Sequence, residues 1–518
     1  MIPMTLARIA EVVGGTLHDV ADPTVEVTGS VEFDSRRVGP GGLFLALPGA
    51  RSDGHDHAPA AVEAGAVAVL AARPVGVPAI VVPPVAPTET NALALEHDSD
   101  GSGAAVLAAL GRLARSVVDT LTESGLTVVG VTGSAGKTST KDMIAAVLAP
   151  LGEVVAPPGS FNNELGHPWT ALRATDSTRF LVLEMSARGP GHIAALGRIA
   201  PPRIGVVLNV GTAHLGEFGS QEVIAQTKGE LVEALPSAAD GGVAILNADD
   251  TLVAKMASRT TARVVTVGTG SGAAYRAEDI HLDEQARASF TAVLPGSDGQ
   301  EQRVPVRLAV HGEHHVGNAL SAIAVAVECG ATAEQAAAAL ATAGPVSAHR
   351  MAVHTRSDGV TVIDDAYNAN PDSMRAAVKA LVTMARSGGF PRRTFAVLGE
   401  MGELGEDSVV AHDAIGRLAV RLDVTRIIAV GATRPVRGLF QGAVMEGSWG
   451  EEASHVPDAD AAIALLREEL QPGDIVLVKA SQSVGLWTVA DALLADDPEP
   501  GSAPDDDTDS AVRTEDAR

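Results

Sequence analysis

The stretch at residues 126–141 constrains the fold of this chain more than any other. It begins with β-prone residues, passes through a Gly/Ser turn to Lys137 and Thr138, and continues into a helical pattern of apolar residues. A strand, a glycine-rich turn and a helix in this order are typical of a phosphate-binding loop, because backbone amides and the helix N-terminus attract phosphate oxygens. Lys137 would add a positive charge, and the Thr138 hydroxyl would bind Mg²⁺.

The loop departs from the general pattern at one position. That pattern has a glycine five residues before Gly136, where this chain has Val131. The loop fits instead the variant Thr-Gly-Ser-Ala-Gly-Lys-Thr at residues 132–138, and the flanking strand and helix favour this interpretation over a chance glycine-rich turn. The residues expected to surround the phosphates are Gly133, Ser134, Ala135, Gly136, Lys137, Thr138 and Ser139.

The composition limits the classes of partner. A chain of 518 residues is expected to form about three domains with a large core. The net charge of −26 and an aromatic content of 3% argue against a nucleic-acid partner. Cys329 is the only cysteine in the sequence, so a disulfide framework and a thiolate metal cluster are excluded. Its Ala-rich helical surroundings favour a small core residue over a nucleophile.

The sequence predicts a cytoplasmic protein without stable membrane insertion. Residues 1–6 lack the basic and apolar regions of a signal peptide. The most apolar region, at 64–86, contains Arg73 and several prolines, which a membrane helix would not tolerate. We also expect a monomer.

The pattern of apolar segments predicts an α/β protein with three domains and a tail. Residues 1–104 are expected to form a small α/β domain, with a helix at 6–13, a strand at 25–32 and a helix at 55–64. Residues 105–346 are expected to form a central domain with a mostly parallel sheet around the phosphate loop, an antiparallel edge at 275–310 and a helix at 313–343. Residues 347–495 predict a second, Rossmann-like α/β domain. Residues 496–518 hold nine acids and two arginines and are expected to be a disordered acidic tail.

Polar residues follow several predicted strands of the central unit. Glu184, Asn209 and Asn247 stand at strand ends, where ligands gather in parallel sheets. A carboxylate such as Glu184 beside a phosphate loop is a usual Mg²⁺ ligand. His214 follows another strand end, where a metal ligand and a hydrogen-bonding histidine are about equally expected. Spacing alone makes Lys228 an ordinary lysine on a helix surface.

Several motifs together resemble those of the Mur ligases, the ATP-dependent amino-acid-adding enzymes of peptidoglycan precursor synthesis. The resemblance runs from about residue 25 to residue 495, with the motifs in the family's order. The motifs lie at residues 132–138, 162–168, 184–186, 209–215, 312–319 and 479–481.

Within that family, residues 365–374 and 162–168 resemble the members that add D-alanyl-D-alanine to UDP-N-acetylmuramoyl-tripeptide. The Asp-Asn-Pro-Arg segment expected of members that add diaminopimelate does not occur in the third unit. Folylpolyglutamate synthases share the phosphate loop but lack a first domain like this one. The resemblance therefore implies a ligase that forms a carbon–nitrogen bond between these two substrates.

The resemblance also implies the role of each site residue. Lys137 and the loop amides would hold the β- and γ-phosphates of ATP. Two Mg²⁺ ions are expected, one on Thr138 and Glu184, the other on His214 and Lys228 after CO₂ has converted that lysine to a carbamate. The remaining nucleotide contacts would be Asn318 to adenine, Arg350 to the γ-phosphate, Asp365 to ribose, Asn368 nearby, and Lys479 to the transferred phosphate.

The substrate contacts implied by the resemblance lie in two segments. Ser35 and Arg36 would meet the UDP-muramoyl substrate, where an arginine can pair bidentately with a pyrophosphate; an exposed turn ion pair is the simpler alternative. Asn162 and Asn163 would contact the sugar-peptide, with an Asx turn as their alternative. The family often has an arginine after Lys-x-Ser, whereas this chain has Gln482.

These residues imply a reaction in which ATP phosphorylates the tripeptide's carboxylate and the dipeptide amine displaces phosphate. Cations and Mg²⁺ would neutralise the charge on the phosphoryl oxygens. Domain closure would exclude water from the acyl phosphate. Two alternatives remain open, a relative that adds a diamino acid at the preceding step and a regulatory P-loop NTPase that does not ligate.

Overall fold

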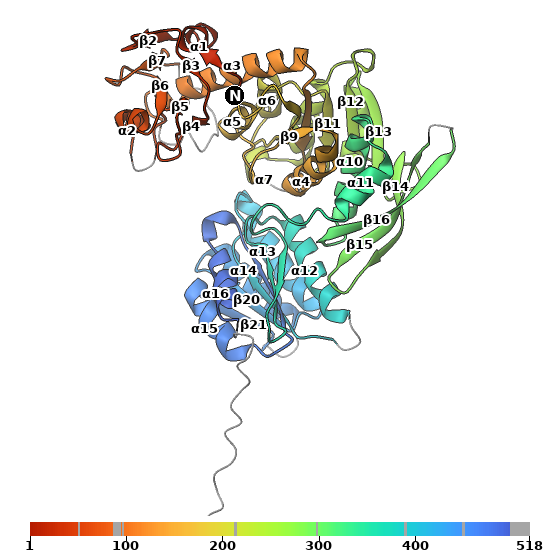
Figure 1. Cartoon of the computed structure of the whole chain (residues 1–518). Helices are drawn as coiled ribbons and strands as arrows, with labels where there is room; N and C mark the ends of the chain where they lie inside the picture. Colours follow the sequence, from red (N-terminus) through yellow and green to blue (C-terminus); the bar gives the residue numbers. More distant parts are fainter. Residues whose placement is uncertain are drawn as a thin grey trace, which may run out of the picture.

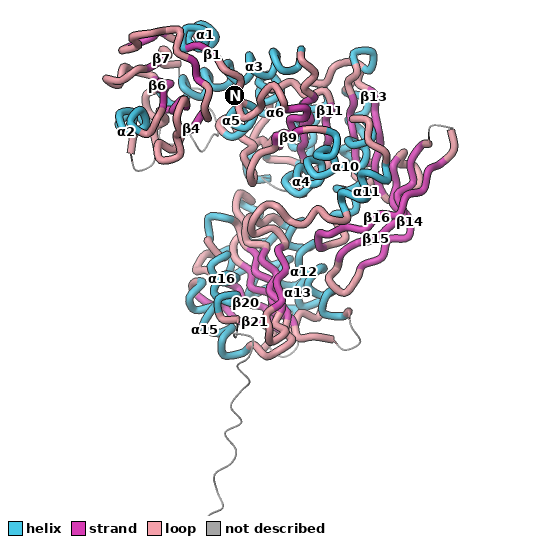
Figure 2. The backbone as a smooth tube through the Cα atoms, viewed as in Figure 1, coloured by secondary structure: helices cyan, strands magenta, loops and turns pink. Residues whose placement is uncertain are grey.

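The chain forms three α/β domains with separate sheets, which Figure 1 shows in sequence colours and Figure 2 by secondary structure. The computed structural model describes residues 1–49, 52–85, 95, 98–211, 215–296, 299–387, 391–447 and 451–497. The blue C-terminal domain lies below the other two in Figure 1, and its upper edge faces the central domain.

The N-terminal domain is built on a five-stranded sheet in the order β2-β7-β6-β5-β4, parallel except between β2 and β7. Its strands are β2 (Thr16–His18), β4 (Val31–Glu32), β5 (Gly42–Leu45), β6 (Ala66–Ala71) and β7 (Ala79–Val81), and β1 (Met4–Thr5) pairs with β3 (Glu26–Val27). Its helices are α1 (Leu6–Val13), the 3₁₀ turn η1 (Gly54–His57) and α2 (Ala58–Glu63).

Two expected elements of this domain are divided. The strand predicted at 25–32 is two short strands, β3 and β4, because Gly29 packs directly on the backbone of Pro40, where a Cβ would lie 2.6 Å from the carbonyl oxygen. The helix predicted at 55–64 begins as a 3₁₀ turn, in which the Asp53 side chain accepts a hydrogen bond from the His55 amide.

A long helix joins the first two domains. Helix α3 (Ser102–Glu123) packs in one continuous apolar core with residues of both the N-terminal and the central sheet. The expected boundary at residues 104/105 lies in the first turn of this helix.

The central domain carries a nine-stranded sheet in the order β16-β15-β14-β13-β12-β11-β8-β10-β9. Pairing is parallel from β9 to β14 and antiparallel from β14 to β16, as expected for the edge at 275–310. The strands are β8 (Thr127–Thr132), β9 (Glu153–Val155), β10 (Thr178–Glu184), β11 (Ile204–Val207), β12 (Val243–Asn247), β13 (Arg263–Gly268), β14 (Tyr275–Leu282), β15 (Arg287–Pro295) and β16 (Glu301–His311).

Helices cover both faces of the central sheet. The face that carries Val129 and Val131 packs against α4 (Lys137–Leu148), α10 (His315–Glu328) and α11 (Ala333–Leu340). The opposite face packs against α3, α5 (Gly166–Ala171), α6 (His192–Ile199) and α8 (Gln221–Glu233). Shorter elements are η3 (Ala149–Leu151), α7 (Leu215–Phe218), η4 (Ala238–Asp240), α9 (Thr251–Ala254) and η5 (Lys255–Arg259).

The helix predicted at 313–343 is interrupted. Gly330 adopts a left-handed φ of 95°, and Thr332 starts α11 with a capping box that it forms with Gln335. Cys329 ends α10 and is half-buried, and burial raises the pKa of its thiol to about 11, so it is a weak nucleophile.

The C-terminal domain has a six-stranded sheet in the order β17-β18-β22-β19-β20-β21, parallel except for β17. Its strands are β17 (Ala352–Thr355), β18 (Thr361–Asp364), β19 (Thr394–Leu398), β20 (Arg426–Val430), β21 (Ala453–Val456) and β22 (Ile475–Lys479). One face is covered by α12 (Pro371–Arg386), α13 (Ser408–Arg421) and α14 (Arg434–Glu446), the other by α15 (Ala459–Glu469) and α16 (Trp487–Ala495). The 3₁₀ turns η6 (Gly405–Asp407) and η7 (Gln482–Val484) complete the domain.

The end of the described chain is tied to this domain. Asp496 pairs with Arg467 at 2.7 Å, and Asp497 accepts a hydrogen bond from Ser357. The remaining residues of the predicted acidic tail lie outside the described residues. Among the described helices, none is both long and apolar enough to span a bilayer.

Candidate active site

A cavity of about 640 Å³ lies between the central and C-terminal domains. Strands β8, β10 and β22 and helices α4, α10 and α12 bring their ends to it. It collects most of the residues that the sequence singles out. These are Ser134, Ala135, Gly136, Lys137, Thr138, Ser139, Asn162, Asn163, Glu184, Asn318, Arg350, Asp365, Asn368 and Lys479.

The glycine-rich loop is held in shape by the segment that follows strand β11. The Asn209 side chain accepts a hydrogen bond from the Ala135 amide at 2.9 Å and donates one to the Ala135 carbonyl at 3.1 Å. Gly136 has a φ of 82° and directly precedes helix α4. Only glycine adopts this conformation without strain, and it turns the chain so that the helix N-terminus faces the cavity.

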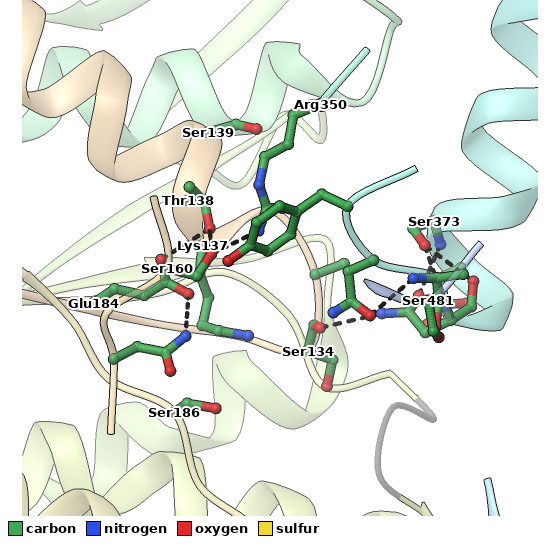
Figure 3. A pocket seen from close by; sticks show the side chains of 18 of the residues that line it. Ser134, Lys137, Thr138, Ser139, Ser160, Glu184, Ser186, Arg350, Ser373 and Ser481 are labelled. Carbon is green, nitrogen blue, oxygen red and sulfur yellow. Dashed lines mark hydrogen bonds between the residues drawn. The ribbon is translucent and has the colours of Figure 1, made fainter. Parts of the chain in front are cut away.

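The hydroxyl of Thr138 and the carboxylate of Glu184 are in contact on the central-domain side. Thr138 Oγ1 donates to Glu184 Oε2 at 2.9 Å, and Asn162 Nδ2 donates to Glu184 Oε1 at 2.7 Å (Figure 3). Both Thr138 and Glu184 are buried, at 2% exposed each. An oxygen pair of this kind is what Mg²⁺ takes from a protein beside a nucleotide.

Lys137 folds back on its own loop. Its Nζ donates to the Gly133 carbonyl at 2.9 Å. Burial lowers its pKa, and the nearby Arg350 guanidinium lowers it further, while the Glu184 carboxylate opposes them. Lys137 and Arg350 thus place two cationic side chains near each other, and a nucleotide phosphate bound between them would compensate their repulsion.

Arg350 enters the cavity from the segment that leads into the C-terminal domain. Its guanidinium carbon lies 4.3 Å from the centroid of the Tyr367 ring, and its Nη2 donates to Ser160 Oγ at 2.6 Å. The residues on either side, His349 and Met351, have left-handed φ values of 58° and 50°. Such values cost energy in non-glycine residues and persist where surrounding contacts enforce them.

Lys479 and Asp365 form a buried ion pair on the C-terminal-domain side. Lys479 ends β22 and is 2% exposed, and its Nζ lies 2.6 Å from Asp365 Oδ2 and donates to the Asn368 carbonyl at 2.8 Å. Asp365 also accepts a hydrogen bond from the Met351 amide. Both predicted cations of this domain therefore face the same cavity as Lys137.

Asn318 lies on the first turns of α10 beside the loop. Its Nδ2 is 3.2 Å from His315 Nδ1, and a Cβ on Gly136 would lie 3.0 Å from its Oδ1. Asn318 therefore packs directly on the helix N-terminus that would hold phosphate, which is compatible with a contact to a nucleotide base.

Lys228 is not a surface lysine. It lies on α8 and is 4% exposed, so the expectation from spacing is wrong. Burial, and then the charge of Lys137, lower its pKa well below the ordinary value. The Lys228 side chain forms no hydrogen bond or ion pair in the part of the chain that the structure describes. His214, its expected partner, lies outside the described residues.

The predicted substrate contacts also have structural partners. Asn163 Oδ1 accepts a hydrogen bond from the Gly166 amide at 2.9 Å at the start of α5, as the Asx-turn alternative predicts. Arg36 is exposed and forms two hydrogen bonds with Asp34 at 2.9 and 2.8 Å, as the ion-pair alternative predicts. Ser35, Arg36, Gly133 and Lys228 do not line the cavity.

Sequence reasoning missed several residues of the cavity. Ser160 joins Thr138 to Arg350, and Tyr367 supports Arg350. Arg188 of the central domain pairs with Glu403 of the C-terminal domain at 2.7 Å at the cavity edge. Tyr367 lies within a motif that was recognised, whereas Ser160, Arg188 and Glu403 carry no local pattern that could have identified them.

The arrangement can bind a nucleotide triphosphate and stabilise a phosphoryl group between two domains. Phosphate would meet the α4 N-terminus and Lys137 from one side and Arg350 and Lys479 from the other. Among the described residues, no three histidine, cysteine or acidic side chains gather as a metal cage. Among these residues, Thr138 and Glu184 offer a metal two oxygen atoms that lie side by side.

Comparisons with known proteins agree with this geometry. The family of Mur ligase middle domains matches residues 131–326, the Mur ligase glutamate ligase domain matches residues 349–482, and the Mur ligase catalytic domain matches residues 28–116. The chain is 63% identical over 511 residues to a Mycobacterium tuberculosis protein named UDP-N-acetylmuramoyl-tripeptide–D-alanyl-D-alanine ligase. That match covers 96% of this chain and 99% of the relative.

Solved structures show the same fold. Acinetobacter baumannii MurF superposes with a TM-score of 0.78 at 29% identity, covering 95% of this chain and 99% of that one. Thermotoga maritima MurF in complex with ADP superposes with a TM-score of 0.72 at 28% identity, covering 90% and 98%.

Proposed function

The chain belongs to the Mur ligase family, and we propose that its interdomain cavity joins D-alanyl-D-alanine to UDP-N-acetylmuramoyl-tripeptide at the expense of ATP. It is a ligase of peptidoglycan precursor synthesis that forms a peptide bond. The observation that carries this conclusion is the cavity itself, because Lys137 of one domain and Arg350 and Lys479 of another line the same space.

The reaction begins with phosphorylation of the tripeptide's terminal carboxylate, which is too poor an electrophile to react with an amine directly. Lys137 and the loop amides hold the β- and γ-phosphates, and Arg350 and Lys479 meet the transferred group from the C-terminal domain. Their charges compensate the negative charge on the phosphoryl oxygens, the main source of rate in phosphoryl transfer. The dipeptide amine then attacks the acyl phosphate, and phosphate leaves.

The C-terminal domain also shapes the rest of the site. Lys479 must exchange its present partner, Asp365, for a phosphate oxygen, which frees the Asp365 carboxylate for the ribose hydroxyls. Asn318 would face the adenine base of ATP. The Asn368 carbonyl accepts a hydrogen bond from Lys479. Contact between the two domains would keep water from the acyl phosphate.

The residues present fit the first of the two expected magnesium sites. Thr138 and Glu184 are already in contact through oxygen atoms, and Asn162 orients the second carboxylate oxygen. Mg²⁺ bound there would neutralise phosphate charge and orient the γ-phosphate. Lys228, buried without an anionic partner among the described residues, suits conversion to a carbamate, which would supply an anionic oxygen to the second Mg²⁺ with His214.

The N-terminal domain would hold the UDP-muramoyl substrate through Ser35 and Arg36, and Asn162 and Asn163 would contact the sugar-peptide. Arg36 would have to leave Asp34 to pair with a pyrophosphate. We expect a monomer acting in the cytoplasm.

A substrate panel tests the function. Purified chain with ATP and Mg²⁺ should release phosphate only when UDP-N-acetylmuramoyl-tripeptide and D-alanyl-D-alanine are both present, with the ligated product detected by mass. Product from the muramoyl-dipeptide and a diamino acid would instead support the relative that acts one step earlier. Phosphate release independent of any acceptor would support a regulatory NTPase.

A further inference from the structure

Ser160 occupies a position between the two halves of the cavity. Its Oγ is 2.9 Å from Thr138 Oγ1 of the central domain and 2.6 Å from Arg350 Nη2 (Figure 3). Neither the motifs nor the family resemblance assigns it a role. It is separated from Arg350 by 190 positions in sequence, so this contact exists only when the domains are together.

The donors and acceptors in this chain of hydrogen bonds can be assigned in only one order. A hydroxyl has a single proton, and Thr138 gives its proton to the Glu184 carboxylate, which has none to offer. Thr138 must therefore accept from Ser160, and Ser160 in turn accepts from Arg350. The guanidinium is linked through two hydroxyls to the carboxylate of the expected metal site.

Arg350 depends on this contact. Ser160 is its only hydrogen-bond partner among the described residues, and its Nε is buried without a partner there. The Tyr367 ring supports the flat face of the guanidinium but cannot fix its rotation in the ring plane. The backbone of Arg350 is fixed by His349, whose carbonyl accepts from the Tyr367 amide, and by Met351, whose amide donates to Asp365.

The loop that carries Ser160 is itself anchored. The next residue, Phe161, packs on Trp169 with ring centroids 4.8 Å apart and on Phe33 of the N-terminal domain at 6.3 Å. Trp169 Nε1 donates to the Val31 carbonyl of that domain at 2.8 Å. Ser160 is therefore a fixed acceptor placed on a surface shared by the first two domains.

We propose that Ser160 is a positioning residue for the ligation, which fixes the guanidinium of Arg350 at the phosphate end of the cavity and links it to Thr138. The inference rests on the proposed function, since it deepens the role of Arg350 there. Ser160 acts through Arg350 and need not touch the reacting atoms itself.

The test is a double-mutant cycle. Ser160→Ala should lower kcat by about 10-fold to 100-fold, the effect of losing one hydrogen bond to a charged group. The KM for D-alanyl-D-alanine should change little. Ser160→Thr keeps the hydroxyl and should restore kcat to within about threefold of the wild type. In an Arg350→Ala background, Ser160→Ala should change kcat by less than about threefold, because the partner is already gone.

Two results would overturn the inference. One is a loss of kcat on Ser160→Ala that is equally large in the wild-type and the Arg350→Ala backgrounds. That result would mean that Ser160 acts on the substrate directly. The other is wild-type kcat in Ser160→Ala. The exposed Ser258, whose hydroxyl donates to the Lys255 carbonyl of its own turn, gives the matched control Ser258→Ala, and thermal unfolding of every variant checks folding.

A binding measurement separates this inference from the proposed function. The same cycle is read by calorimetry as the affinity for MgATP without any muramoyl substrate. If the wild type fails to ligate the dipeptide, the proposed function fails, yet weaker MgATP binding in Ser160→Ala that disappears in the Arg350→Ala background still supports the positioning role. Equal MgATP affinity in wild type, Ser160→Ala and Arg350→Ala would overturn it.

Discussion

Lys228 carries an amine that the fold buries without a counter-ion among the described residues. An ammonium in such a place is costly, because burial removes hydration and Lys137 adds repulsion. The neutral amine that this environment favours is the form that reacts with CO₂. The same burial that makes the lysine unfavourable as a cation thus makes it suitable as a carbamate.

We expect Lys228→Ala to lower ligation by at least about 100-fold, the usual cost of a lost group that compensates phosphoryl charge. Acetate or another small carboxylate should restore part of the activity by replacing the carbamate oxygens. The rate is measured as phosphate release with and without acetate. Lys255→Ala, at an exposed position of the same domain, should be unaffected. Full activity of unrescued Lys228→Ala would remove the carbamate from the mechanism.

His167 predicts an acid-sensitive stability. It is fully buried in α5, and the backbone of Glu184 and Leu196 lies near its ring without compensating for the loss of hydration. Burial lowers the pKa of His167 from 6.5 to about 4. Between pH 6.5 and pH 4, His167 is mostly protonated in the unfolded chain and mostly neutral in the folded chain. The free energy of unfolding therefore falls as the pH drops toward 4. At pH 5 the loss is about 2 kcal/mol.

His167→Leu, which has nearly the same volume, should remove this part of the pH dependence. The free energy of unfolding in urea is compared at pH 7.5 and pH 5 for both proteins. The wild type should lose about 2 kcal/mol more than the variant over this interval. Equal losses would mean that His167 is protonated in the folded state.

Single residues were predictable from sequence where function constrains neighbours along the chain. The loop at 132–138 could be identified because phosphate binding fixes consecutive residues, and Lys479 because it stands in a recognised motif. Ser160 could not be identified, because its partners lie 22 and 190 positions away. Lys228 was misjudged by spacing alone, since helix periodicity does not report what packs over a helix surface.

Among the elements, helices α13 and α14 approach each other unusually closely. Each carries a glycine that faces the backbone of the other. A Cβ on Gly416 would lie 2.0 Å from the Leu439 carbonyl oxygen, and one on Gly442 would lie 2.3 Å from the Asp413 carbonyl oxygen. Backbone atoms cannot move aside as a flexible side chain would, so both positions exclude any larger residue.

Gly416→Ala should therefore destabilise the C-terminal domain by about 2 to 3 kcal/mol, the upper part of the range for overpacking. Gly317 of α10 has nothing within 4 Å of a built Cβ, so Gly317→Ala should be neutral or stabilising by up to about 1 kcal/mol. Calorimetry distinguishes the two variants by the midpoint temperature of thermal unfolding, which shifts by about 2 to 4 °C per kcal/mol in a domain of this size. Gly416→Ala with a wild-type midpoint would contradict the packing.

Elements with a strong periodic pattern were predicted well. Helix α1 begins and ends where the sequence predicts. The errors lie where a single residue interrupts a continuous pattern. Gly29 divides one predicted strand, and the turn at Gly330 with the Thr332 cap divides one predicted helix. Close backbone approach and capping are contacts between distant or offset residues, which apolar periodicity does not encode.

At the scale of the whole molecule, the fold class and the family predicted from the motifs are confirmed by the three family domains and the superposed relatives. The relative placement of the domains could not be predicted, because it depends on a few contacts between loops. Asn370 Nδ2 donates to the Ser134 carbonyl at 3.5 Å, and Gly216 packs on Gly405, where a Cβ would lie 2.5 Å from the amide nitrogen. Small residues at these points let the backbones of the two domains meet.

The ion pair between Arg188 and Glu403 joins the two domains and should favour the arrangement in which they are in contact. Its side chains are 24% and 37% exposed, so solvent screens the pair and its contribution is expected to be about 0.2 to 1 kcal/mol. Glu403→Gln should therefore raise the KM for ATP by no more than about fivefold and should increase the radius of gyration measured by small-angle scattering. Because the pair is partly exposed, the difference from the wild type should shrink as salt is added. The exchanged pair, Arg188→Glu with Glu403→Arg, should recover compactness if the attraction between the charges holds the domains together. If the exchanged pair is as open as Glu403→Gln, the geometry of these two loops rather than their charges closes the cavity.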